Sequence, residues 1–544
     1  MPLQPLEELN ESRVIGPPGT GKTTFLARQI EHDAERHGSE AVVALSHTNA
    51  AAREIASRKV PLPAENVGTL HSFAYRALGS PTLVQLEPFL SQFSEEHPEF
   101  RLSGKLDVNE LEVRGTQLAM RGDKLMQEYH RMRNLQRPRE LWPFPVQIFA
   151  RVWEEFKRKQ NGIDFTDMIE HCLADVNELP GSREVLIIDE AQDLSGLQLA
   201  LLWKWAKSIG KVIMSLDADQ SIFGFAGANP RVFLENKPDR QKILQQSYRL
   251  PRQVYEYAIR WIGQNTDREP ITFKPRDAEG SVQMLSRSTW KGPELLLPTI
   301  GDELAEGRSV MLLASCAYML QPLVAVLRAE GIPYWNPYRF DNGAWNPLGR
   351  RGPGSTLGCF QAYLRPWTDP SEQAPLWTGA ELVAWLDMTK GIVRRGMKQG
   401  MAFNDDVAED KPVSIEALVR LIGEDNLTQA LQGPPQGSAW LARHLLKARS
   451  SVGEYVAGIV GKHGAGALRE APRVTIGSIH SVKGGEADTV ILFPDLSQQG
   501  LMSYQRNGTE AVRRAFYVGM TRARERLLLC PAAQSSSAIQ WPAI

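Results

Sequence analysis

The feature that most constrains this chain is a glycine-rich loop, Gly16-Pro17-Pro18-Gly19-Thr20-Gly21-Lys22-Thr23-Thr24. It fits the phosphate-binding pattern G-x-x-x-x-G-K-[ST] at every defined position. That pattern needs a strand before the loop and a helix after it, and the sequence predicts a strand over 13–15 and a helix over 24–30. A glycine-rich turn that matches by chance is the alternative, and the flanking elements argue against it.

The loop predicts a nucleotide site, with all nine of its residues as ligands. Backbone N–H groups in such a loop surround phosphate oxygens. Lys22 is expected to reach the β- and γ-phosphates, and the Thr23 hydroxyl is expected to bind Mg²⁺. The pattern indicates a nucleotide but leaves open the chemistry that the nucleotide drives.

Size and composition predict a globular protein with several domains. The 544 residues exceed what one hydrophobic core supports, and 42% hydrophobic with 23% charged residues is ordinary. A formal net charge of -1 excludes a uniformly basic nucleic-acid coat but leaves room for a local basic groove.

Cysteine usage and hydropathy favour a cytoplasmic protein. No two cysteines form a C-x-x-C pair, which indicates reduced thiols without a zinc site or an iron–sulfur cluster. No run of about 18 apolar residues predicts a membrane span, and residues 1–11 are polar and acidic, unlike a signal peptide. The four cysteines are Cys172, Cys316, Cys359 and Cys530.

Apolar runs of strand length alternate with helical runs, which predicts parallel sheets covered by helices. Further strands are expected over 41–46, 185–188, 211–216, 307–315, 474–476, 489–493 and 526–530, and residues 67–73 are expected to repeat the strand–loop–helix pattern. Further helices are expected over 50–58, 115–136, 145–160, 166–176, 317–331, 381–388, 415–423 and 510–525. The tail 532–541 is expected to be loose.

Helical sequence interrupts the alternation twice, so the fold class is α/β with two parallel-sheet blocks that each carry a mainly helical insertion. The expected division is 1–78 and 163–249 for the first block, 79–162 for its insertion, 250–340 and 471–544 for the second block, and 341–470 for a second, short insertion.

The helix expected over 115–136 has an apolar face and a charged face. Its charges have two interpretations, a solvated surface or a nucleic-acid contact. The apolar positions are Leu118, Leu125, Tyr129, Met132 and Leu135, and the charged ones are Arg121, Lys124, Arg131 and Arg133.

Two acidic residues follow the buried strand 185–188, at the edge of a parallel sheet where ligands bind. Asp189 is suited to hold Mg²⁺, and Glu190 to orient or deprotonate an attacking water. An exposed acidic loop is the alternative.

Polar and aromatic residues follow the strand 211–216. The amide of Gln220 is suited to sense a γ-phosphate. Phe223 and Phe225 are spaced to offer faces for unpaired bases, at about 1–3 kcal/mol per stacked base. Two core phenylalanines are the alternative, since buried phenylalanine is common.

Two arginines and a late glycine-rich loop complete the candidate residues. Arg249 and Arg522 are candidates to close on a γ-phosphate, where an arginine supplies about 10³–10⁵ in rate. Surface salt bridges are the alternative for each. The loop 478–486, with His480 and Glu486, suits contacts to phosphate or ribose, and a plain turn is its alternative.

Together and in this order, these motifs resemble superfamily 1A DNA helicases of the UvrD/Rep/PcrA group. The most specific are LDADQSIFGFAGA, QSYRLP, IHSVKGGE and FYVGMTRARERL. The resemblance covers most of the chain, with the two insertions matched only by position. It implies two RecA-like domains with ATP between them and one helical insertion in each.

The resemblance also implies roles for individual residues. Lys22 and Thr23 would bind phosphates and Mg²⁺, Asp189 would hold Mg²⁺, and Glu190 would be the catalytic base. Residues implied to contact the γ-phosphate are Gln220, Arg249 and Arg522. Tyr248 would stack on adenine and Glu486 would touch the ribose. Residues implied to face single-stranded DNA are His47, Asn49, His71, Phe223, Phe225 and His480.

The chain departs from the family pattern at several positions. The glutamine that reads adenine upstream of the loop has only Gln4 as a candidate, at a poor spacing. The family has a phenylalanine before the dipeptide Thr-Asn and a lysine after it, and these positions are His47 and Ala50 here. The family's base-stacking motif has a tryptophan and an arginine, and these positions are Phe225 and Ala226 here.

The resemblance predicts an ATP-driven motor on single-stranded or tailed DNA, with ATP and Mg²⁺ as cofactors. The expected activity is a 3′-to-5′ helicase, with the polarity carried by the resemblance alone. Alternatives are a translocase with little unwinding, or a nucleotide-gated DNA sensor in a repair or defence complex. A monomer or weak oligomer is expected, with protein partners in repair, replication or defence and no membrane.

Overall fold

The computed structural model describes residues 10–103, 120–236, 238, 240–339, 343–349, 352, 354–368, 376–393, 411–506 and 508–544, apart from the side chains of 49–51, 499 and 506. The chain divides into two compact units. The first comprises Met1–Arg287, Leu313–Tyr318 and Ser478–Ile544, and the second comprises Ser288–Leu312 and Met319–Gly477.

The first sheet has six parallel strands in the order β3-β2-β4-β5-β1-β6. Its strands are β1 (Glu11–Ile15), β2 (Val42–Ser46), β3 (Val67–Thr69), β4 (Val185–Asp189), β5 (Lys211–Leu216) and β6 (Arg240–Ile243). Strand β4 is apolar through its first four residues and buried along its whole length, as a central parallel strand must be. The strands predicted before the phosphate loop and at 41–46, 185–188 and 211–216 are confirmed, and β3 and α3 form the unit predicted to begin at 67–73.

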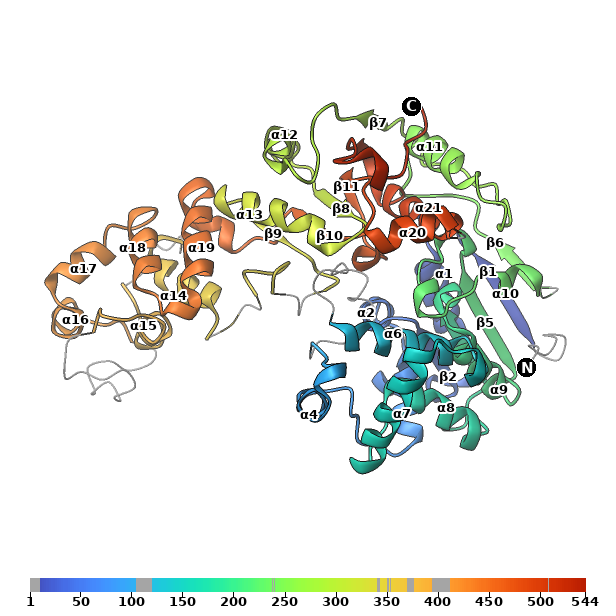
Figure 1. Ribbon diagram of the computed structural model, residues 1–544. Coiled ribbons are helices and arrows are strands. Elements are labelled where there is room, and N and C mark those ends of the chain that lie inside the picture. The colour runs from blue at the N-terminus through green and yellow to red at the C-terminus, as the bar shows by residue number, and fades with distance from the viewer. Residues whose placement is uncertain are drawn as a thin grey trace. The chain divides into compact units, whose positions relative to one another are not determined.

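Helices surround this sheet (Figure 1), and several of them have capped N-termini. They are α1 (Lys22–His37), α2 (Asn49–Ser57), α3 (Leu70–Ala77), α8 (Phe165–Asp175), α9 (Gly196–Ala206) and α10 (Arg231–Glu235). Helix α11 (Arg252–Ile262) follows them in the chain but packs against the second sheet. Thr69, Asp164 and Ser195 each accept a hydrogen bond from the backbone N–H three residues later. Such caps fix where α3, α8 and α9 begin.

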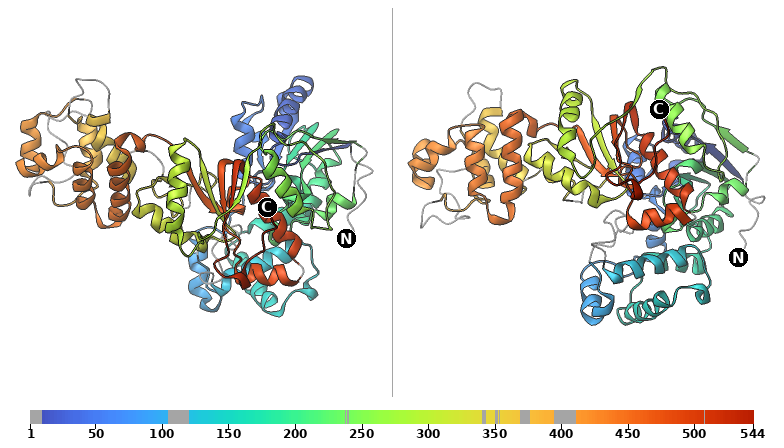
Figure 2. Two further views of the ribbon diagram at one scale, coloured as in Figure 1. Left: turned by 90° about the horizontal axis from the view of Figure 1, so that it is seen from above. Right: turned by 45° about the horizontal axis from the view of Figure 1, so that its top comes forward.

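The first helical insertion is built around aromatic side chains. Its helices are α4 (Phe89–Glu96), α6 (Arg121–Asn134) and α7 (Phe144–Lys159). Helices α6 and α7, both teal, lie side by side (Figure 2). Phe93 packs edge-on against Trp153 with ring centroids 4.9 Å apart, in a core that also contains Tyr129 and Met132. Of the predicted apolar face of α6, Leu118 lies outside the described residues.

The second sheet also has six strands, in the order β7-β12-β11-β8-β10-β9. They are β7 (Ser281–Met284), β8 (Val310–Ala314), β9 (Tyr334–Trp335), β10 (Val474–Ser478), β11 (Ala487–Leu492) and β12 (Ala523–Leu529). The pairs β9–β10, β11–β12 and β7–β12 are parallel. Helices α12 (Leu297–Ala305), α13 (Gln321–Ala329), α20 (Gln498–Arg506) and α21 (Thr509–Met520) accompany this part of the chain. Two parallel-sheet α/β blocks are therefore confirmed.

The segment between β9 and β10 is helical in its described parts. Its helices are α14 (Thr356–Thr368), α15 (Gly379–Leu386), α16 (Ile415–Ile422), α17 (Glu424–Ala430), α18 (Gln436–His444) and α19 (Ser450–His463). Tyr363 stacks on Trp377 with ring centroids 5.7 Å apart and meets Trp385 edge-on, so aromatic rings form the centre of this group. The helices predicted at 381–388 and 415–423 are confirmed, whereas the proposed domain boundaries stay predictions.

Two predictions about the C-terminal region are wrong. The helix expected over 510–525 ends at Met520, because the chain turns at Thr521 and Ala523 starts β12 between β11 and β7. The tail expected to be loose is docked. Its Ile539 is buried, and the Trp541 indole donates to the Cys530 carbonyl at 2.7 Å.

The interpretation of Arg133 as a surface charge is also wrong. It is buried and donates to the carboxylates of Asp164, Asp167 and Glu170 at 2.5–3.1 Å. Asp164 and Asp167 lie at the start of α8 and Glu170 lies in its middle. All three are more than 30 residues from Arg133 in the sequence, so no local pattern indicates the pairing. Among the described residues, no helix has the length and apolar character needed to cross a bilayer.

Candidate nucleotide site and its neighbours

The phosphate loop connects β1 to α1 and is held against the next strand. The Gly16 N–H donates to the Leu216 carbonyl at 3.1 Å, and the Thr20 hydroxyl donates to the Pro17 carbonyl at 2.8 Å. Gly19 has φ +73°, and a Cβ placed there would lie 2.4 Å from the Cβ of Arg249. A glycine is therefore required at this position, both by the backbone conformation and by the close approach of Arg249.

Lys22 and Thr23 begin α1 and face the acidic end of β4. The Lys22 ammonium donates to the Gly16 carbonyl at 2.7 Å and lies 3.6 Å from a carboxylate oxygen of Glu190. The Thr23 hydroxyl lies 3.5 Å from the Asp189 carboxylate, which also accepts from Ser215 at 2.9 Å. The predicted phosphate and metal ligands therefore lie together, although they are more than 160 residues apart in sequence.

The two neighbouring carboxyls have opposite electrostatic environments. Burial and the adjacent charge of Glu190 raise the pKa of Asp189 to about 6. Burial also opposes ionisation of Glu190, but the nearby ammonium groups of Lys22 and Lys483 outweigh it and hold the pKa of Glu190 below its usual range. Glu190 has φ +54°, a left-handed conformation that turns the chain immediately after β4. Glu190 is thus an ionised acid beside the phosphate loop.

Gln220 and Arg522 form a buried pair. The Gln220 side-chain NH₂ donates to Asp217 at 2.6 Å, and its carbonyl oxygen accepts from Arg522 at 3.0 Å. Arg522 also donates to the carbonyls of Val518 and Gly485 at 3.0 and 3.1 Å. The surface salt bridge weighed for Arg522 is therefore excluded, since the side chain is 2% exposed.

Arg249 and Glu486 form a second pair. The Arg249 guanidinium donates to Glu486 at 2.7 Å and to the Thr521 carbonyl at 3.3 Å. Tyr248 precedes it and is 72% exposed, with its backbone N–H bound to the Gly19 carbonyl at 2.8 Å. The backbone of Tyr248 is therefore bound to the phosphate loop, while its ring is largely exposed to solvent.

Lys483 is a residue that the sequence reasoning missed. Its ammonium forms an ion pair with Asp193, lies 3.4 Å from Glu190, and donates to the Gln220 carbonyl at 2.8 Å. It also lies 5.6 Å from the centre of the Phe223 ring. The sequence signal for Lys483 is its position inside the motif IHSVKGGE.

Four of the predicted DNA-facing rings form one cluster. Phe223 lies 5.0 Å from His47 and 5.9 Å from Phe225, and His480 lies 5.6 Å from Phe225. Phe223 is 1% exposed, as in the core alternative, whereas Phe225 is half-buried. His71 instead meets Phe165 edge-on at 6.0 Å, and the side chain of Asn49 lies outside the described part of the chain.

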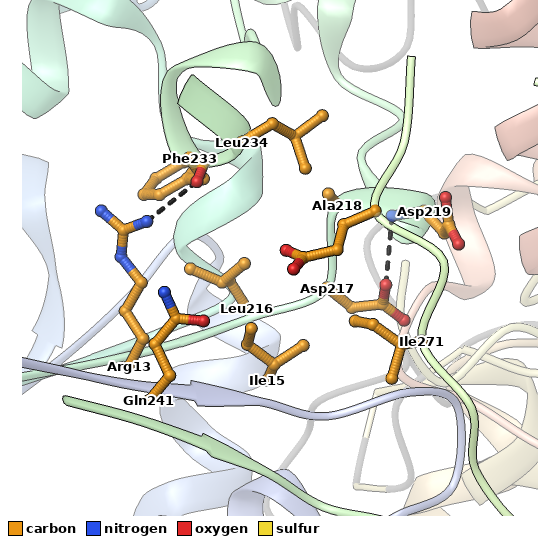
Figure 3. Close-up of a pocket in the computed structure, with 11 residues that line it drawn as sticks. Arg13, Ile15, Leu216, Asp217, Ala218, Asp219, Phe233, Leu234, Gln241 and Ile271 are labelled. Atoms are coloured by element: carbon orange, nitrogen blue, oxygen red, sulfur yellow. Dashed lines mark hydrogen bonds between the residues drawn. The ribbon is translucent and has the colours of Figure 1, made fainter. Parts of the chain in front are cut away.

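A pocket borders the turn after β5 but contains none of the predicted nucleotide ligands (Figure 3). Arg13, Gln241 and Phe233 lie along one side of it, and Asp217 and Asp219 along the other. Burial and the charge of Asp219 raise the pKa of Asp217 to about 6. The pocket is therefore separate from the phosphate loop, although it shares the turn that positions Gln220.

The parallel sheets and the loop after β1 define a phosphate-loop nucleotide-binding protein of the α/β class. The sequence matches the UvrD/REP helicase N-terminal domain over residues 4–241 and the UvrD-like helicase C-terminal domain over residues 473–530. The chain belongs to the UvrD/Rep-like helicase family.

The curated relatives that this chain matches are distant in sequence and longer than this chain. The chain is 27% identical to DNA helicase II of Salmonella typhimurium over 279 residues, which cover 47% of this chain and 38% of that protein. It is 26% identical to the ATP-dependent DNA helicases UvrD1 and UvrD2 of Mycobacterium tuberculosis. Those matches cover 47% and 71% of this chain and 38% and 55% of the relatives. The chain thus spans about half or less of each relative's length.

Proposed function

We propose that this protein is an ATP-dependent motor on single-stranded DNA in the cytoplasm, with helicase activity of 3′-to-5′ polarity. The observation that carries the proposal is the convergence of Lys22, Glu190 and Arg249 around one phosphate loop. The names of the relatives support ATP and DNA as the ligands. The polarity rests on the family resemblance.

The residues of the loop fit a Mg²⁺–nucleotide. Thr23 and Asp189 offer the hydroxyl and carboxylate oxygens that Mg²⁺ prefers, and they would hold it. The ion would supply charge neutralisation at the transferred phosphoryl group. The exposed ring of Tyr248 would stack on the adenine, and Glu486 would accept from the ribose.

The remaining steps are assigned to side chains of this chain. Lys22 would leave the Gly16 carbonyl for a phosphate oxygen, which keeps its charge paired. Glu190 would accept the proton of the water that attacks the γ-phosphorus, as the leaving oxygen departs with ADP. Arg249 and Arg522, with Gln220, would neutralise charge on the γ-phosphate.

The proposed DNA contacts are the ring cluster and the loops around it. Phe225 and His480 would meet bases, and His47, Asn49, His71 and Phe223 would line the same strand. Because Phe223 is buried beneath His47 and Lys483, it would have to become exposed before a base could stack on it. Lys483 touches both this cluster and Glu190, which favours a nucleotide site that responds to DNA.

The deciding experiment is ATP hydrolysis with and without single-stranded DNA, with Glu190→Gln as the control. We expect strong stimulation by DNA in the wild type. The control should bind ATP but turn over at least about a hundredfold more slowly, since general-base catalysis contributes about 10²–10⁴. A wild-type rate of ATP hydrolysis that DNA does not change would contradict the proposed motor activity. It would favour a sensor that binds nucleotide and DNA without coupled turnover.

A translocase with little unwinding is the second candidate, because it would use the same site. At the ring cluster, Phe225 and Ala226 replace the tryptophan and arginine of the family. These replacements favour weaker stacking on bases and therefore weaker strand separation. Partners in a repair, replication or defence complex are part of this alternative.

A further inference from the structure

The last turn of α6 brings the first helical insertion against two loops of the first sheet. Asn134 ends this helix. Its side-chain carbonyl accepts from the Ser195 hydroxyl at 3.3 Å. A Cβ added to Gly227 would lie only 2.8 Å from the Cβ of Asn134. Gly227 has φ +102°, so this loop depends on glycine for its conformation as well as for the space that Asn134 fills.

The two loops that Asn134 touches are functional candidates. One contains Ser195 and follows Glu190 by five residues, and the other contains Phe223 and Phe225 and ends at Gly227. The loops also meet each other directly through an antiparallel bridge between Ser195 and Ala228. A displacement of either loop therefore changes its contact with α6.

Helix α6 is fixed to α8 within its last two turns. Besides the three carboxylates bound by Arg133, the buried ring of His130 lies 2.7 Å from Thr166 and 2.7 Å from Gln85. Gln85 accepts in turn from the Phe165 N–H at 2.8 Å. Because buried polar groups with complete partners resist rearrangement, α6 is a rigid support for whatever its C-terminus contacts.

We propose that Asn134 is a positioning residue, which holds the loop 223–227 and the loop 190–195 at a fixed spacing from the helical insertion. This inference rests on the proposed function in one respect only, that DNA contact at the first loop is felt at Glu190 on the second. Asn134 touches neither nucleotide nor DNA in this assignment. It acts through Ser195 and Gly227.

The first test measures amide hydrogen exchange in the wild type and in Asn134→Ala, without nucleotide or DNA. Backbone hydrogen bonds from Ala226, Gly227 and Ala228 close the 223–227 loop, so their exchange reports its stability. We expect exchange to accelerate about threefold to tenfold in both loops, the effect of losing one neutral hydrogen bond. The matched control is Arg131→Ala, which removes a surface pair with Glu128 on the same helix. Unchanged exchange in either loop overturns the proposal, whatever the protein's activity is.

The second test compares DNA-stimulated with unstimulated ATP hydrolysis. We expect Asn134→Ala to keep the unstimulated rate within twofold and to lose about threefold to tenfold of the stimulated rate. Asn134→Asp retains an acceptor for the Ser195 hydroxyl and should restore stimulation. Equal losses in both rates, with a lower melting temperature, would show a structural role and overturn the proposal. Absence of stimulation in the wild type would contradict the proposed motor instead, and the exchange experiment would still decide the role of Asn134.

Discussion

At the scale of single residues, Lys22 is the side chain whose surroundings are most informative. It is 9% exposed, and its ammonium is bound to a loop carbonyl and close to Glu190. A buried cation is stable only with such partners. A nucleotide phosphate would offer stronger ones, so the lysine is held ready within the loop that it would serve.

We expect Lys22→Ala to reduce ATP turnover by about a thousandfold or more, the loss typical for removing one cation from a transferred phosphoryl group. Steady-state hydrolysis with saturating single-stranded DNA measures this. Lys159→Ala, which removes an exposed lysine paired with Glu155, is the matched control and should retain the wild-type rate. Near-normal turnover in the Lys22 variant would contradict the assignment of the nucleotide site.

At the scale of elements, the charged junction among α6, α7 and α8 is central. Asp164 caps α8 and is buried, and it accepts from Arg133 and Lys157 as well as from the Trp153 indole at 3.1 Å. Burial opposes its ionisation, but the two cations outweigh burial and hold the pKa of Asp164 well below its usual range. The junction therefore depends on a carboxylate that stays charged.

We expect Asp164→Asn to lower the free energy of unfolding at pH 7 by about 3–5 kcal/mol, since two buried cations lose their shared partner. Because the folded-state pKa is depressed, the carboxylate stabilises the fold above its unfolded pKa of about 3.9. That contribution is lost as pH falls further. Urea unfolding at several pH values measures the difference between the two proteins, which should shrink below about pH 4.

The surface variant Glu155→Gln, which removes a pair with exposed Lys159, is the control and should leave unfolding nearly unchanged. A difference for Asp164→Asn that stays constant from pH 7 to pH 3 would show that the charge of this carboxyl does not stabilise the junction.

The same junction shows what sequence can and cannot predict. The phosphate loop, β4 and α8 were predictable, because local patterns of glycine, apolar runs and an aspartate cap specify them. The burial of Arg133 was not, since its partners come from a different helix more than 30 residues away. The end of α21 was missed because pairing of β12 between two strands overrode the helical character of residues 521–525.

The site residues also divide into those that the sequence predicts and those that it does not. Motif order placed Lys22, Asp189 and Gln220 at strand ends, where parallel topology gathers them. Neither the role of Lys483 nor the burial of Phe223 follows from a local pattern, because both depend on contacts between β-sheet loops distant in sequence.

At the scale of the whole molecule, the family assignment predicts directed movement along DNA. We expect ATP-dependent unwinding of a duplex that carries a 3′ single-stranded tail, and none of the same duplex with a 5′ tail. Gel or fluorescence assays of strand displacement measure both, with Glu190→Gln as the inactive control. Displacement of a protein block from single-stranded DNA without unwinding would favour the translocase, and preference for the 5′ tail would contradict the polarity.

The docked C-terminal tail has a spectroscopic consequence. The indole of Trp541 lies 6.1 Å from that of Trp261 on α11 and 5.6 Å from the Phe516 ring on α21. Aromatic rings this close interact electronically, so their near-ultraviolet signal depends on the tail staying in place. The difference between the spectra of the wild type and Trp541→Phe isolates this pair from the other tryptophans. The chain therefore contains its own optical reporter of whether the segment after β12 is bound to α11 and α21.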